Sequence, residues 1–91
     1  MSQANNYIIK LGLEGKEYEE PIEGRYLFHL DDSNEFSRIY TKLENDESLE
    51  LQDADLSPKE KVSSITYSGD GIDISLKANF QTDTYFVIIE E

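Results

Sequence analysis

Several residue types that support common kinds of protein chemistry are missing or rare in this 91-residue chain. It has no cysteine, which excludes disulfide bonds, thiolate catalysis and cysteine-ligated metal sites. No segment approaches the ~20 consecutive apolar residues of a membrane-spanning helix. The first residues, 1–6, lack the basic and apolar regions of a signal peptide. We therefore expect a cytoplasmic protein that does not act at a membrane.

Basic residues are also scarce. Eight Lys and Arg stand against twenty Asp and Glu, which gives a formal net charge of −12. Direct binding to nucleic acid is not expected, because contact with phosphates needs a basic patch. Solubility alone requires a net charge of only about 2–8 in magnitude, and a larger excess destabilises a small domain by self-repulsion. The excess therefore favours a basic protein surface as the partner.

Signatures of catalysis and of cofactor binding are absent. His29 is the one histidine, and it falls inside a predicted strand without a nucleophile motif nearby. The glycines form neither a dinucleotide-binding nor a phosphate-binding pattern. The segment Asp53-x-Asp55-x-Ser57-x-x-Glu60 resembles a calcium loop only superficially, because it lacks the central glycine and places its glutamate too early. We predict no enzyme activity, no catalytic residues, no cofactor and no metal site, and an acidic loop at this segment.

Apolar periodicity predicts two strands and a helix in the first half. Residues 7–13 alternate like a strand, and residues 25–30 form a second strand, so that the pair is expected to make an N-terminal hairpin. The acidic connection at 14–24 is a turn or a weak edge strand. Phe36, Ile39, Tyr40 and Leu43 then follow helical spacing, which predicts a helix over roughly 34–44.

The second half reads more clearly as strands. Residues 62–68, 72–80 and 84–90 are separated by turn signals at Gly69-Asp70-Gly71 and 81–83. Within 44–61 a short strand is possible, because Leu49 and Leu51 alternate with Glu50. The sequence thus predicts one α+β domain over residues 1–91. Its mainly antiparallel sheet has about five strands and one helix packed on one face, in the order β-β-α-(β)-β-β-β.

Two acidic runs, 14–23 and 44–55, are the candidate binding surface. A rigid array of carboxylates can imitate the phosphates of a duplex and occlude a basic nucleic-acid channel. Small acidic inhibitors of uracil-DNA glycosylase, anti-CRISPR proteins and nuclease-immunity proteins share this size and charge, although no motif links the chain to them. The predicted contact residues are Glu14, Glu17, Tyr18, Glu19, Glu20, Glu23, Glu44, Asp46, Glu47, Glu50, Asp53 and Asp55.

The leading interpretation is therefore a non-enzymatic protein-binding module, in the form of a nucleic-acid-mimicking inhibitor or an immunity protein. It requires that the two runs gather on one face of the folded chain. In a second interpretation the domain is structural, and forms a homo-oligomer or joins a larger assembly through a sheet edge or an aromatic face. In the simplest interpretation the charge only keeps a small domain soluble.

Overall fold

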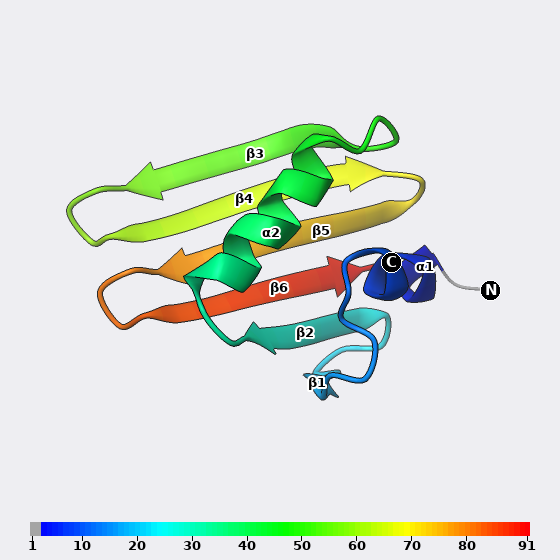
Figure 1. Ribbon diagram of the computed structural model, residues 1–91. Coiled ribbons are helices and arrows are strands. Elements are labelled where there is room, and N and C mark those ends of the chain that lie inside the picture. The colour runs from blue at the N-terminus through cyan, green and yellow to red at the C-terminus, as the bar shows by residue number, and fades with distance from the viewer. Residues whose placement is uncertain (1–2) are drawn as a thin grey trace.

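The computed structural model describes residues 3–91, and within them shows one six-stranded antiparallel sheet with two helices on one of its faces (Figure 1). The sheet order is β1-β2-β6-β5-β4-β3. The α+β prediction is confirmed, with one strand and one helix more than expected. The elements are α1 (Gln3–Lys10), β1 (Tyr18–Glu19), β2 (Arg25–Leu30), α2 (Ser33–Glu44), β3 (Glu50–Ser57), β4 (Val62–Gly69), β5 (Ile72–Asn79) and β6 (Thr84–Glu90).

The centre of the sheet follows the apolar pattern of the sequence. In β5, Ile72, Ile74, Leu76 and Ala78 are buried, while the residues between them face the other side of the sheet. The continuous apolar run of β6 lies between β2 and β5, as expected for a central strand. The turns at 69–71 and 81–83 join β4 to β5 and β5 to β6. These predicted strands are confirmed.

Helix α2 confirms the helix predicted over 34–44. The Asp32 carboxylate accepts a hydrogen bond from the Glu35 backbone N–H at 2.9 Å. The Glu35 carboxylate in turn accepts from the Asp31 backbone N–H at 3.0 Å. This reciprocal capping satisfies free donors at the start of the helix. The helix lies diagonally across one face of the sheet (Figure 1), and its buried residues Phe36 and Ile39 join the core.

The strand predicted over 7–13 is wrong, because α1 covers most of it and the chain turns after Lys10. Tyr7 and Leu11 are buried four residues apart, whereas Ile9 remains 59% exposed. A short apolar run fits both a strand and a helix, and here packing against the sheet decides for the helix. The expected N-terminal hairpin is therefore also wrong, since β2 pairs with β1 and β6.

The segment at 44–61 holds a longer strand than expected. β3 spans eight residues and pairs with β4 along its length, apart from an irregularity between Leu51 and Asp53. The acidic loop predicted from Asp53 to Glu60 is therefore a strand as far as Ser57, and only the turn at 58–61 lies outside it. The register irregularity between Leu51 and Asp53 breaks the alternation of apolar and polar residues, which hid the full length of the strand in the sequence.

Candidate protein-binding edge

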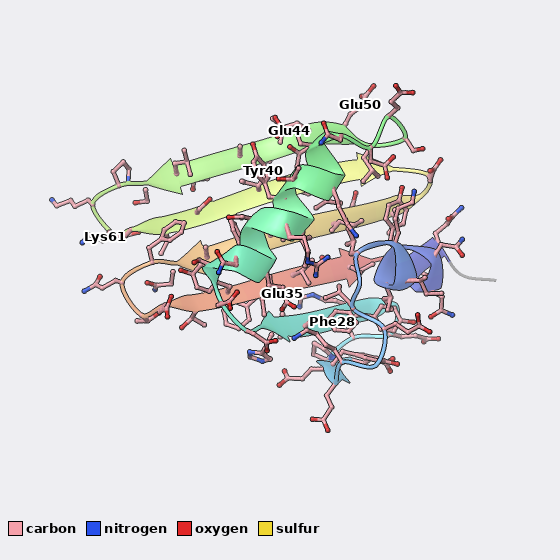
Figure 2. All side chains as sticks on the ribbon, in the orientation of Figure 1. Phe28, Glu35, Tyr40, Glu44, Glu50 and Lys61 are labelled. Carbon is pink, nitrogen blue, oxygen red and sulfur yellow. The ribbon has the colours of Figure 1, made fainter. Side chains whose placement is uncertain are left out.

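The two acidic runs lie at opposite edges of the sheet. β1, within the first run, is one outer strand, and β3, within the second, is the other. Five strand intervals separate them, which is ~24 Å at ~4.8 Å per interval. Charges at the surface are screened over ~8 Å at physiological salt. β1 and β3 therefore do not bring the two runs together as one continuous face. Figure 2 shows Glu50 near one edge of the sheet and Phe28, on β2, near the other.

Little of the first run, 14–23, lies in regular secondary structure. Only two of its residues form a strand, and that strand pairs with β2. The Tyr18 ring is 47% exposed and packs against Tyr26 and Phe28, with centroids 5.3 and 5.2 Å away. The Glu19 carboxylate lies 3.7 Å from the ring nitrogen Nε2 of His29. The remaining predicted contact residues of this run are exposed in the segments around β1: Glu14, Glu17, Glu20 and Glu23.

Asp46 belongs to the second run but is engaged inside the molecule. Its carboxylate accepts hydrogen bonds from the Lys10 ammonium group at 3.3 Å and from the Ser48 backbone N–H at 2.9 Å. Burial alone would raise the pKa of Asp46, but the bonds from Ser48 and Lys10 outweigh burial and hold this pKa below its ordinary value. Asp46 thus ties α1 to the connection between α2 and β3, and its charge is already partnered.

Tyr7 lies beside this contact. Its hydroxyl is buried beside the Asp46 carboxylate. Burial first, and the negative charge of Asp46 second, raise the pKa of Tyr7 to about 12. The pair therefore keeps a neutral phenol against a carboxylate where α1 meets the core.

Three carboxylates of β3 share the uncovered face of the sheet. Residues directly opposite each other on paired strands point to the same face. Glu50, Asp53 and Asp55 are opposite small polar residues of β4, namely Ser68, Thr66 and Ser64. These three lie on the face opposite to buried Tyr67. The irregularity after Leu51 shifts the register by one residue, which is how Glu50 and Asp53 come to the same side.

These three carboxylates are unpaired among the residues that the structure describes. None of the ion pairs within residues 3–91 includes Glu50, Asp53 or Asp55. Lys77, on β5, is on the same face and lies opposite Ser64 of β4. Its backbone is therefore two strand intervals, or ~10 Å, from the backbone of Asp55. Glu44 and Glu47, which come before β3, are likewise exposed and outside those ion pairs. This side of β3 is thus a rigid row of unpaired negative charge.

The opposite side of β3 is apolar and open. Leu51 and Leu56 are 57% and 68% exposed, and Ala54 lies between them opposite Ile65. Helix α2 crosses the sheet diagonally, and Leu51 and Leu56 nevertheless remain mostly exposed (Figure 1). Figure 2 places Tyr40 and Glu44, in the second half of α2, on the β3 side of the helix. β3 therefore has a carboxylate face and an apolar face along one edge strand.

The structure places His29 on β2, and the calcium-like segment on β3 and in the turn after it. The His29 side chain is 60% exposed and its ring lies 4.9 Å from that of Phe86 on the uncovered face. Asp53 and Asp55 lie on a strand, and the Glu60 carboxylate accepts a hydrogen bond from the Ser57 hydroxyl at 3.3 Å. No cluster of three or more potential metal ligands occurs within residues 3–91.

Sequence reasoning found the carboxylates of β3 and noted Leu51, but it missed the apolar face that Leu51, Ala54 and Leu56 form. The signal was present, because Leu51, Ala54 and Leu56 interleave with the acidic residues. The register break hid the alternation, since no single period of two covers Leu51 and Ala54 together.

Comparison of the chain with protein-family models, with curated proteins and with solved structures found no match. Among the helices formed by residues 3–91, neither has the length and apolar character needed to cross a membrane.

Proposed function

We propose that this chain is a non-enzymatic protein-binding module that docks a basic surface of its partner on β3. The observation that carries this proposal is the row of Glu50, Asp53 and Asp55 on one face of an edge strand, none of which forms an ion pair within residues 3–91. An unpaired row of like charges destabilises the domain by mutual repulsion. The electrostatic energy of the row becomes favourable when a cationic surface covers it.

The second acidic run is better suited to this role than the first. β3 is paired with β4 on both sides of the irregularity between Leu51 and Asp53, so its carboxylates are held in place before a partner arrives. Preorganised groups lose less conformational freedom on binding than groups on loops. The first run lies mostly outside regular structure and contains Lys16, whose ammonium group contacts Asp31 and Glu35. We therefore assign docking to β3 and the residues before it.

Inhibition of a nucleic-acid-handling protein is the narrower form of this proposal. Asp53 and Asp55 are separated by ~6.8 Å along the strand, about twice the 3.4 Å axial spacing of phosphates in one strand of a duplex. Neighbouring phosphates are farther apart in space than along the axis, because each strand winds around it, so the spacing of Asp53 and Asp55 is compatible with that of phosphates. Steric occlusion of a basic channel, with long-range attraction to speed association, is the mechanism that we propose.

Paired capture experiments test the docking surface. The tagged wild-type chain is compared with Asp53→Lys plus Asp55→Lys, and with the matched control Glu17→Lys plus Glu20→Lys at the other edge. We expect a basic protein to bind the wild type and the control but not the β3 variant. Its association rate with the wild type should fall at least about tenfold between 50 and 500 mM salt. Equal capture by the β3 variant, or a rate independent of salt, would contradict the proposal.

A further inference from the structure

The outer side of β3 is an open hydrogen-bonding edge. Half of the backbone N–H and C=O groups of an outer strand point away from the sheet and can pair with another chain. In natural edge strands, bulges and charges discourage such pairing. In β3 the irregularity lies near the start, between Leu51 and Asp53, so residues 53–57 form an unbroken ladder with β4. This regular portion is the part of the edge that an added strand can follow.

We propose that β3 binds its partner by strand addition, and that the added segment alternates Lys or Arg with apolar residues. Side chains of neighbouring strands line up on each face of a sheet. On one face, Asp53 and Asp55 would be beside the cations of the added strand. On the other face, Ala54 and Leu56 would be beside its apolar side chains. The inference rests on the proposed function and adds the mode of binding and the sequence pattern of the ligand.

The same geometry disfavours a second copy of this chain as the occupant. Antiparallel pairing of β3 with another β3 about a twofold axis keeps each face on its own side. Asp53 and Asp55 of one copy would therefore lie next to the same carboxylates of the other. Like charges directly opposite each other on paired strands are destabilising. Charge complementarity thus selects a basic segment over self-association at neutral pH.

A peptide titration on the wild-type protein tests the backbone contribution. The probe is an acetylated and amidated seven-residue peptide of alternating Lys and Val, and binding is followed by NMR shifts of the protein amides. The matched peptide carries N-methyl groups on the three residues that would donate to β3, with the same charge and side chains. Three lost hydrogen bonds of about 1 kcal/mol each correspond to about 100-fold weaker binding. Two methylated peptides are made, one for each set of alternate residues. Only the peptide methylated on the N–H groups that face β3 is expected to bind more weakly.

A second arm tests where the peptide binds. The alternating peptide is titrated against Asp53→Asn plus Asp55→Asn, and against Glu17→Asn plus Glu20→Asn as the control. We expect about tenfold weaker binding to the β3 variant and unchanged binding to the control. In the wild type, the largest amide shifts should fall in β3 and not in β1. Light scattering should show the free protein as a monomer at neutral pH.

The outcomes separate strand addition from the proposed function. If neither methylated peptide binds more weakly while the β3 variant does, strand addition is overturned and the acidic docking surface stands. If the β3 variant binds the peptide as well as the wild type, then both are overturned. Failure of the alternating peptide to bind, or a stable dimer joined through β3, would overturn strand addition.

Discussion

The two edges of the sheet contain similar acidic sequences but differ in their structural support. β1 is a two-residue strand within a segment of turns, whereas β3 is an eight-residue strand paired along its length with β4. At the β1 edge, Glu19 lies beside His29, and the nearby Lys16 forms ion pairs with Asp31 and Glu35. At the β3 edge, the carboxylates of the strand are without such neighbours. Similar composition therefore produces a supported charged surface at one edge only.

The contrast shows that the number of charges in a chain and their arrangement on its surface are separate properties. Net charge is fixed by composition and acts on the whole domain. A binding surface needs side chains held on one face, with their charges unpaired and their positions set by backbone hydrogen bonds. The following predictions test whether the β3 edge is supported in the way that the structure indicates.

Among the changes near the two edges, the largest expected effect is at Gly69, which contacts the chain leading into β3. A Cβ added there would overlap the carbonyl oxygen of Ser48. The overlapping oxygen belongs to the backbone and cannot move aside as the end of a side chain can. We therefore expect Gly69→Ala to lower the free energy of unfolding by about 2–3 kcal/mol. The matched change near the other edge is Gly15→Ala, where the space is open and only the positive φ of 87° is strained. It should cost about 1 kcal/mol.

Urea unfolding of both glycine variants, followed by circular dichroism, measures the difference. Equal losses in the two variants would mean that the connection before β3 is as tolerant as the segment before β1. In that case the structural contrast between the two edges would be weaker than described.

Asp46 should show the next largest effect. Asp46→Asn removes the charge that Lys10 and the Ser48 N–H stabilise, and should cost about 1–2 kcal/mol at pH 7. Because the pKa of Asp46 is lowered in the folded state, its contribution is present above the unfolded-state pKa of about 3.9. It is lost as the pH falls through the folded-state pKa. The stability gap between wild type and variant should therefore shrink below about pH 4.

Urea unfolding at pH 7 and at pH 3 checks this dependence. Glu47→Gln is the control, since Glu47 is an exposed neighbour outside the ion pairs of residues 3–91. A gap that stays constant with pH would show that Asp46 contributes through its shape and not through its charge.

The two glutamates at the ends of α2 should behave in opposite ways. Glu35 caps the start of the helix and its carboxylate lies 3.1 Å from the Lys16 ammonium group. Glu35→Gln should therefore destabilise the protein by about 0.5–1 kcal/mol. Glu44 is the last residue of the helix, where a negative charge opposes the helix dipole. Glu44→Gln should stabilise by about 0.3 kcal/mol. Thermal unfolding of the two variants compares them, and a loss of stability in both would contradict this assignment.

The smallest expected effect on stability is at Leu56. This side chain is 68% exposed, so Leu56→Ser should change the free energy of unfolding by less than about 0.5 kcal/mol. Leu76→Ala, at a fully buried position of β5, should cost about 2–5 kcal/mol. A large loss at Leu56 would show that the apolar side of β3 is already covered within the domain, and chemical denaturation of both variants decides this.

Much of the fold could be predicted because buried residues recur at regular intervals along strands and helices. Strands β4 to β6 and helix α2 follow the periods of two and 3.6 residues. The strand expected at 7–13 was wrong because its apolar residues fit both periods, and only contact with the sheet distinguishes them. The candidate site was found in part. Its acidic residues are conspicuous, whereas its apolar face is hidden by the register irregularity after Leu51.

Composition and apolar periodicity by themselves determined that this chain is a negatively charged α+β domain with an antiparallel sheet, because those properties depend on residue identity and local spacing. Only the tertiary structure decided which strands are outermost. The pairing of β2 with β6 joins segments far apart in the chain, and it places β1 and β3 at opposite edges. Separation in space, and not in sequence, determines whether charges act together, and so only the fold could divide the acidic residues into two surfaces.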